Sequence, residues 1–197
     1  MVSQAERRAA TRGAILQAAG ELFSRQGFAA TTVDEIAAAA GVAKGAVYHH
    51  FPAKEAMFEA VFEETSLVLV RRVMAASMNA RDVLDGMVVG SRAYFAACAE
   101  PAVGQVILRD GPTVLGWEKW RRIDSEHFGR MIPAALGAAM DQGLLARRPV
   151  EPLARLLVGA VTEAAVACAV SDDPAGTGRE HVAALEAVID GLRVKGG

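Results

Sequence analysis

Two short helical segments separated by a glycine constrain the fold of this chain more than any other feature. The segment Thr32–Glu35 has the capping-box pattern that begins a helix, and Gly41 is placed to end that helix in a left-handed turn. A second short helix is predicted over Lys44–Phe51, because Pro52 lacks the N–H that a continuing helix needs. Two short helices joined by a tight turn with a glycine are typical of the helix-turn-helix unit.

The second short helix has an apolar and a polar face. Val47 and Phe51 are four residues apart and are therefore expected to point inward. A cation, a glycine and two polar aromatic residues occupy the remaining surface, which suits a groove lined by phosphates: Lys44, Gly45, Tyr48 and His49. Similar short helices occur in any small bundle, so spacing and composition alone leave DNA binding and simple packing equally open.

Composition predicts an all-α protein of one domain or two small ones. Forty of the 197 residues are alanine, the best helix former, and aromatic residues make up only 6%. Two cysteines cannot form a disulfide framework, which favours a reducing, cytoplasmic setting. The longest apolar run, residues 156–170, contains Glu163 and is shorter than a membrane span, so we expect no membrane segment.

Charge is unevenly distributed along the chain. The whole sequence has a net charge of −2, which is no footprint of nucleic-acid binding. Residues 1–54 contain six basic and four acidic residues, a formal charge of +2, whereas residues 55–197 carry a formal charge of −4. The two parts are therefore expected to meet different partners.

The sequence of the N-terminal part resembles a known family. Residues 27–37 read GFAATTVDEIA, residues 40–51 read AGVAKGAVYHHF, and Lys54-Glu55 follows. These segments resemble the DNA-binding domain of the tetracycline-repressor (TetR-type) regulators. The resemblance implies a three-helix DNA-binding domain over residues 1–54. It also implies an all-helical ligand-binding and dimerisation domain over residues 55–197, with about nine helices in total.

The resemblance also implies which residues contact DNA. Thr32 would meet a phosphate, and Lys54 would do the same where the fourth helix begins; the recognition helix would contribute Lys44, Gly45, Ala46, Tyr48 and His49. Ala43 and Ala53 stand where the family often has Ser or Thr. The missing side-chain cap at Ala43 costs about 1 kcal/mol. His49 stands where a second Tyr is common.

The C-terminal part reads as a series of helices. We predict helices over residues 54–79 and 81–98, a short one ending near Arg109, and a turn at residues 110–112. A largely helical segment over residues 113–142 should be kinked or divided at Pro133. After a break, helices are expected over residues 150–170 and from Arg179 to about Val194, with a second break at residues 172–176.

The last two predicted helices have so many apolar residues that these residues must be buried against other helices. Internal core and a dimer interface built from two helices of each subunit both provide such burial. The family resemblance favours a homodimer, and one short reading helix per subunit also calls for two copies. The expected interface residues are Leu153, Leu157, Val161, Ala164, Leu185, Val188, Ile189 and Leu192.

A cavity for a small, largely apolar effector is expected in the C-terminal part, and residues 110–121 look like a recurring subclass of these regulators. Candidate lining residues are Tyr94, Phe95, Cys98, Trp117, Trp120, His127, Met131 and Glu163. For each of them an ordinary core position is an open alternative. A carboxylate such as Glu163 inside the most apolar helix must be paired, exposed or functional, with Arg92 or Arg109 as possible partners.

No catalytic or metal-binding pattern is present in the sequence. It contains no phosphate-binding glycine loop, serine nucleophile elbow or metal-spaced His/Cys cluster, so we expect no enzyme, no metal and no cofactor. We predict a homodimeric repressor that binds a palindromic operator and is released by a small molecule. The alternatives are a small all-α enzyme or carrier that uses the same cavity, and a helical interaction protein.

Overall fold

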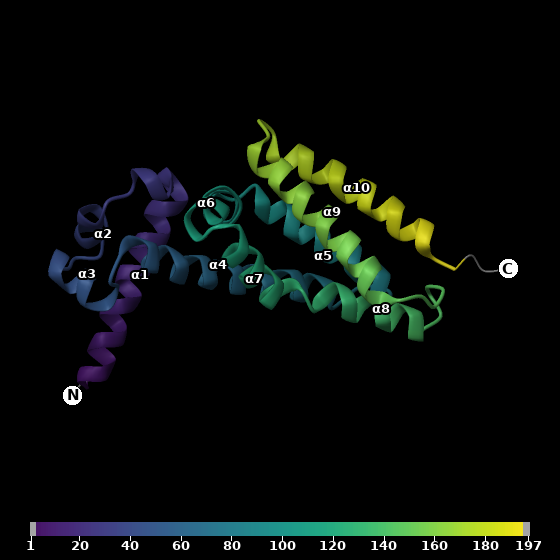
Figure 1. Cartoon of the computed structure of the whole chain (residues 1–197), viewed down its shortest axis with the longest axis horizontal. Helices are drawn as coiled ribbons and strands as arrows, with labels where there is room; N and C mark the ends of the chain where they lie inside the picture. The colour runs from purple at the N-terminus through teal and green to yellow at the C-terminus, as the bar shows by residue number, and fades with distance from the viewer. Residues whose placement is uncertain (1–2, 195–197) are drawn as a thin grey trace. The chain divides into compact units, whose positions relative to one another are not determined.

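The fold is all-α, as predicted. The computed structural model describes residues 3–194, apart from the side chains of Asp124 and His127, and every regular element within that range is a helix (Figure 1). About nine helices were expected, and this range contains ten α-helices and one π-helix, η1. Their bounds are α1 Gln4–Ala30, α2 Val33–Ala39, α3 Lys44–His50, α4 Lys54–Ser77, α5 Val83–Cys98, η1 Ala102–Asp110, α6 Gly111–Leu115, α7 Trp117–Phe128, α8 Met131–Asp141, α9 Val150–Val170 and α10 Pro174–Leu192.

The chain forms two compact units. The N-terminal unit contains the residues up to Thr65 together with Pro101–Trp120, and the C-terminal unit contains Ser66–Glu100 and the residues from Arg121 onward. The helix α4 contributes residues to both units. Sequence alone gave no sign that η1 and α6 would belong with the first three helices.

An aromatic cluster lies in the core of the N-terminal unit. The rings of Phe23, Phe28 and Phe58 contact one another with centroids 5.3–5.7 Å apart. Trp120 is buried, and its indole N–H donates to the Ile107 carbonyl at 2.9 Å. A buried indole therefore keeps a hydrogen-bond partner, and η1 is held onto this core.

The corner after α1 depends on a glycine in a left-handed conformation. Gly27 has φ 80°, which interrupts the helical path near the end of α1. The next amide, that of Phe28, donates to the Asp110 carboxylate at 2.7 Å, and the Thr31 hydroxyl donates to the Gly27 carbonyl at 2.8 Å. The corner is thereby fixed to η1, from a position 82 residues away in sequence.

The predicted turn at residues 110–112 is wrong. Asp110 ends η1, and α6 begins directly at Gly111 with Pro112 in its first turn. Proline is compatible with this position, because the first N–H groups of a helix have no helical acceptor. Asp110 and Gly111 have a packing role instead, since the Asp110 side chain holds the α1 corner and Gly111 is buried.

The core of the C-terminal unit is a set of packed helices. The helix α10 packs against α5 and α9, and α8 packs against α5 and α9 (Figure 1). Within the described residues α9 is the one helix long and apolar enough to span a membrane, and a third of its most apolar stretch is buried. Its packing against α5, α8 and α10 accounts for the buried part of this stretch.

Two predicted boundaries shift. Pro133 does not divide a helix, because the breaks fall at Gly116, with φ 78°, and between α7 and α8, which leaves Pro133 in the first turn of α8. The last helix begins at Pro174 rather than at Arg179. There Asp173 caps the helix by accepting from the Gly176 amide at 2.9 Å. Both prolines stand in first turns, where a missing N–H costs nothing.

Gly111→Ala is predicted to destabilise the N-terminal unit. An added Cβ would lie 2.9 Å from ring atoms of both Phe62 and Trp120, so the core would have to shift, at a cost of about 1–3 kcal/mol. Gly13→Ala in α1 is the matched control, because no atom lies within 4 Å of its added Cβ. Alanine should stabilise the helix there by about 0.5–1 kcal/mol. Urea unfolding followed by tryptophan fluorescence measures both effects, and equal stability of the two variants would contradict the packing argument.

Candidate functional site

The first short helix of the helix-turn-helix, α2, begins with the predicted capping box. The Thr32 hydroxyl accepts from the Glu35 amide at 3.2 Å, and the Thr32 amide donates to the Glu35 carboxylate at 2.8 Å. The bond from the Thr32 amide is the main cause of the lowered pKa of Glu35, and the Thr32 hydroxyl, which donates to the same carboxylate at 2.8 Å, is the second cause. The turn after α2 contains Gly41 with φ 67°, so the predicted left-handed position is confirmed.

The second short helix, α3, is oriented by its two buried residues. Val47 is fully buried and Phe51, just after the helix, is 4% exposed, as their spacing predicts. No side chain caps α3, because Ala43 has no hydroxyl. The orientation of α3 therefore depends on apolar burial and on the turn rather than on a cap.

The opposite face of α3 is open to solvent. Lys44, Gly45, Tyr48 and His49 are exposed, and Ala46 is partly exposed. Tyr48 shows 48% of its surface. An exposed, uncapped helix with a phenol, an imidazole and an ammonium has the shape and the donors that a DNA groove accepts.

Lys44 is paired with a carboxylate that the sequence reasoning did not single out. Its ammonium lies 2.9 Å from the carboxylate of Asp34 on α2. The hydrogen bond to Asp34 is the main cause of the raised pKa of Lys44. The two residues are ten positions apart, and only the turn between α2 and α3 brings them together.

Lys54 is placed differently from a simple phosphate contact. Its ammonium donates to the carbonyls of Phe28 and Thr31 at 2.8 and 2.7 Å and lies 4.1 Å from the centroid of the Phe28 ring. The side chain thus connects the beginning of α4 to the corner between α1 and α2. Backbone N–H groups at the beginning of α4 are a separate set of donors.

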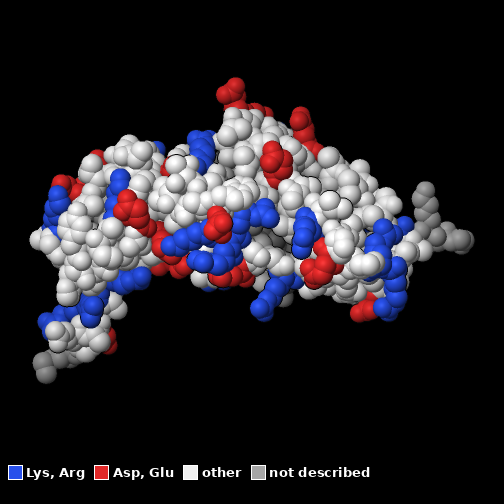
Figure 2. Space-filling model, in the orientation of Figure 1, with Lys and Arg blue, Asp and Glu red and all other residues white. Residues whose placement is uncertain are grey.

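Arginines of α1 add positive charge to this unit. Arg7, Arg8 and Arg12 are exposed, and Figure 2 shows basic side chains over the N-terminal half of α1. The guanidinium of Arg12 lies 5.1 Å from the centroid of the Phe51 ring, at the end of α3. Burial is the main cause of the lowered pKa of His50, and the nearby Arg8 and Arg12 charges contribute. Sequence reasoning counted these arginines only as charge.

The C-terminal unit contains a mostly apolar cavity of about 380 Å³. Its wall comes from α4, the segment before α5, and the helices α5, α7, α8, α9 and α10. The lining residues are Val73, Ser77, Ala80, Asp82, Val83, Gly86, Met87, Gly90, Ser91, Tyr94, Phe128, Met131, Ile132, Ala135, Leu157, Val158, Val161, Thr162 and Leu185. The volume is within the range of about 300–1,000 Å³ that ligand cavities occupy.

The predicted effector residues fall in different places. Tyr94 and Met131 line the cavity. Phe95 and Cys98 are buried in the same unit. Trp117 is 59% exposed and Trp120 is buried, and both belong to the N-terminal unit.

The remaining two candidates are ionisable. Glu163 is exposed on α9, which is one of the three outcomes expected for a carboxylate in that helix. Arg92, one of its suggested partners, lies 3.9 Å from Glu186 instead. The side chain of His127 lies outside the described residues. Burial raises the pKa of Cys98 to about 12, so this thiol stays protonated at neutral pH.

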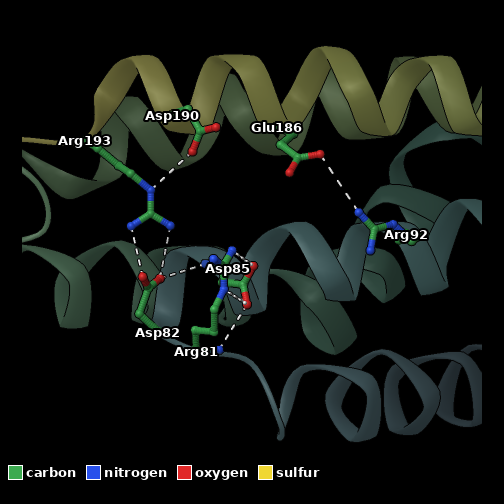
Figure 3. Close-up of polar contacts among 7 residues, drawn as sticks. All are labelled: Arg81, Asp82, Asp85, Arg92, Glu186, Asp190 and Arg193. Carbon is green, nitrogen blue, oxygen red and sulfur yellow. Dashed lines mark hydrogen bonds and ion pairs between the residues drawn. The ribbon is translucent and has the colours of Figure 1, made fainter.

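A carboxylate and an arginine meet at the edge of the cavity. Asp82 caps α5 by accepting from the Asp85 amide at 2.8 Å, and both of its oxygens accept from the Arg193 guanidinium, at 3.0 and 3.2 Å (Figure 3). The bonds from Arg193 are the main cause of the lowered pKa of Asp82. No local pattern in the sequence could have predicted the pairing of Asp82 and Arg193, because they are 111 residues apart.

The outward surfaces of α9 and α10 include apolar and small residues beside charged ones. Of the eight predicted interface residues, Leu157, Ala164 and Ile189 are buried inside the chain, and Val161 and Leu185 line the cavity. Leu153 and Leu192 are partly exposed, and Val188 is 50% exposed. Of the eight, Val188 is the one that is exposed, and other exposed residues lie beside the predicted ones: Leu156, Gly159, Ala160 and Glu163 on α9, and Ala184, Ala187 and Gly191 on α10.

Two curated relatives match part of this chain. The HTH-type transcriptional repressor KstR2 of Rhodococcus jostii is 36% identical over 83 residues, which is 41% of this chain and 41% of that protein. The HTH-type transcriptional regulator AcrR of Shigella flexneri is 49% identical over 53 residues, 27% of this chain and 25% of that protein. The matched part therefore spans less than half the length of either relative.

Matches to family models and to a solved structure cover most of the chain. Residues 15–61 match the bacterial regulatory proteins of the tetR family, and residues 84–192 match the tetracyclin repressor-like C-terminal domain. The crystal structure of a TetR-family transcriptional regulator from Pectobacterium atrosepticum is 32% identical, with a TM-score of 0.85, and covers 99% of this chain and 100% of that one. The chain therefore belongs to the TetR family of bacterial transcriptional regulators, which are DNA-binding proteins rather than enzymes.

Proposed function

We propose that this regulator is a cytoplasmic repressor that binds a palindromic operator as a homodimer and is released by a small, largely apolar effector. The observation that carries the proposal is the open polar face of α3, with Tyr48 half exposed and Val47 fully buried behind it. A face of this kind has no packing role within the N-terminal unit. Family membership makes DNA the partner to expect.

The proposed DNA contacts divide into two groups. Tyr48, His49 and Gly45 face the bases and sugars of the groove, because they lie on the exposed side of α3. Thr32 and the first N–H groups of α4 meet phosphates, since helix beginnings favour negative charge. Lys54 acts by holding the corner from which both α2 and α4 start.

Lys44 has to exchange partners when DNA binds. In the structure its ammonium is held by Asp34, and both side chains are more than half exposed. A phosphate that approaches α3 competes with this carboxylate for the same cation. The pair is solvent-screened and therefore weak, which makes the exchange inexpensive.

The homodimer is proposed to form through the outward surfaces of α9 and α10. Leu156, Gly159, Ala160 and Glu163 on α9 recur at i, i+3, i+4 and i+7, and so do Ala184, Ala187, Val188 and Gly191 on α10, so each set forms one stripe along its helix. Small residues in both stripes allow two copies to approach closely in a four-helix arrangement. The proposed interface uses the two helices predicted from sequence, but some of the residues that face the partner differ from the predicted ones.

The helix α4 is proposed to transmit effector binding from the cavity to the DNA-binding helices. This helix begins at Lys54 beside the DNA-binding helices, and its later residues Val73 and Ser77 line the cavity. A ligand that favours one position of α4 shifts the population of dimers toward one spacing of the two α3 helices. Operator affinity falls if that spacing no longer fits successive major grooves.

The purified dimer is expected to bind DNA from directly upstream of its own gene. Binding should weaken steeply with added salt, because released counterions contribute to the affinity. Electrophoretic mobility shift at several salt concentrations, with a scrambled fragment of equal length as control, measures this. Equal affinity for both fragments at every salt concentration would contradict a sequence-specific regulator.

Tyr48→Ala is predicted to weaken operator binding by about tenfold while leaving dimerisation unchanged, because the ring is exposed on α3. Tyr48→Phe is the control that keeps the ring and removes the hydroxyl, so the pair separates packing in the groove from hydrogen bonding. Fluorescence anisotropy of labelled DNA gives the affinities, and light scattering gives the mass. Loss of the dimer in Tyr48→Ala would show that Tyr48 is a packing residue.

Lys44→Met is predicted to lower the slope of log affinity against log salt by about 1, because one phosphate contact is lost. Asp34→Asn removes the competing carboxylate at 2.9 Å and should raise the affinity at low salt. The same anisotropy assay measures both. An unchanged slope in Lys44→Met would mean that Lys44 stays with Asp34 in the complex.

Val188→Glu is predicted to convert the dimer to a monomer, because it places two carboxylates in an apolar interface. Val68→Glu on α4 is the matched control, since Val188 and Val68 are 50% and 49% exposed. Sedimentation equilibrium reports the mass, and circular dichroism checks the helix content. A dimeric Val188→Glu with normal operator binding would place the interface elsewhere.

A further inference from the structure

We infer that the effector is an uncharged, compact, mostly apolar molecule with one hydrogen-bonding group, and that Ser91 and Thr162 recognise that group. The inference rests on the proposed effector-controlled function and adds the chemical class of the effector. Three properties of the cavity carry it: its size, its two unused hydroxyls and the pairing of its charges.

The volume of the cavity and the composition of its wall favour a small apolar ligand. The cavity of about 380 Å³ is near the lower end of the range for ligand sites. Side chains such as Val73, Met87, Ile132, Leu157 and Leu185 surround it. Burial of hydrocarbon against such a wall is favourable in proportion to its area, so a compact ring with a short chain fits this space better than a large polar molecule.

Two hydroxyl groups in the wall are available to a ligand. Ser91 on α5 and Thr162 on α9 line the cavity, and within the described part of the chain neither side chain has a hydrogen-bond partner. Ser77 differs, because its hydroxyl is near the Val73 and Gly86 carbonyls at 3.0 and 2.9 Å. An occupant that displaces water from Ser91 and Thr162 has to offer a polar atom, since unpaired polar groups cost free energy.

The charges at the cavity are already neutralised. Asp82 is the one charged side chain among the described lining residues, and Arg193 binds both of its oxygens. Figure 3 shows that the neighbouring charges on α5 and α10 are paired as well, Arg92 with Glu186 and Arg193 also with Asp190. A buried ligand charge would therefore lack a counterion among these residues, which disfavours carboxylates, phosphates and ammonium ions alike.

A matched series of four probes tests the class directly. The probes are 4-propylphenol, propylbenzene, 4-propylbenzoate and 4-propylbenzylammonium, titrated calorimetrically into the full-length protein at pH 7 without DNA. We expect 4-propylphenol to bind about three- to tenfold more tightly than propylbenzene, from one neutral hydrogen bond. Both ions should bind at least tenfold more weakly than the phenol. An ion that binds as tightly as 4-propylphenol, or binding by none of the four, overturns the inference.

Variants of the wall test the assigned residues. Ser91→Ala and Thr162→Val should reduce the preference for 4-propylphenol over propylbenzene, whereas Thr113→Val on the exposed surface of α6 should keep it. Arg193→Gln leaves Asp82 without its ion partner and should strengthen binding of 4-propylbenzylammonium at least tenfold. This gain of binding requires a folded protein, so misfolding cannot imitate it. Unchanged preferences in the first two variants together overturn the role of the hydroxyls.

The outcome is separable from that of the proposed function, because the titrations contain no DNA. Specific operator binding with no binding of any probe would remove the inferred class and leave the regulator. Phenol binding in a protein that binds no DNA would keep the class and remove the regulator.

Discussion

The corner between α1 and α2 is the constraint on which the DNA-binding helices depend. Gly27 turns the chain, the Asp110 carboxylate accepts from the Phe28 amide, and the Lys54 ammonium donates to the Phe28 and Thr31 carbonyls. Four elements thus meet at a few backbone groups. Because buried backbone groups are costly to leave unpaired, this corner fixes where α2 begins and, through the turn at Gly41, where α3 lies.

Positive charge is scarce on the helix-turn-helix, and this scarcity is compatible with DNA binding. The Lys54 ammonium donates to backbone carbonyls, and the Lys44 ammonium is paired with Asp34, which we propose a DNA phosphate replaces. The arginines of α1 add charge from outside the helix-turn-helix. A small formal charge on residues 1–54 is therefore compatible with operator binding, since the proposed affinity comes also from helix beginnings and from two copies of each contact.

The helices α9 and α10 both line the cavity and form the outward surface that we propose for dimerisation. Inward residues of α9 and α10, among them Leu157 and Leu185, line the cavity, and Val188 and Leu156 face outward. A ligand in the cavity therefore touches the same helices that we propose to hold two copies together. The ion pair of Asp82 and Arg193 closes the first turn of α5 against the end of α10, so the cavity is bounded by paired charges.

Much of the N-terminal unit could be predicted from sequence, because its determinants are local. The capping box of Thr32 and Glu35, the left-handed Gly41 and the burial of Val47 all follow from spacings of a few residues, and the structure confirms them. The all-α class follows from composition and helical periodicity. The family resemblance carried the function, because no local rule distinguishes a DNA-reading helix from a packed one.

Tertiary structure decided what lies far apart in sequence. Periodicity identified α9 and α10 as apolar on a wide band but could not divide that band between cavity and outer surface, since burial depends on which helices pack alongside. The predicted turn at residues 110–112 failed for the same reason: Asp110 and Gly111 are fixed by Phe28, Phe62 and Trp120 rather than by their neighbours. Sequence by itself determined the all-α class, the two short helices α2 and α3, and which face of α3 is polar. Only packing decided which hydroxyls and charges surround the cavity, because residues such as Asp82 and Arg193 meet across 111 positions.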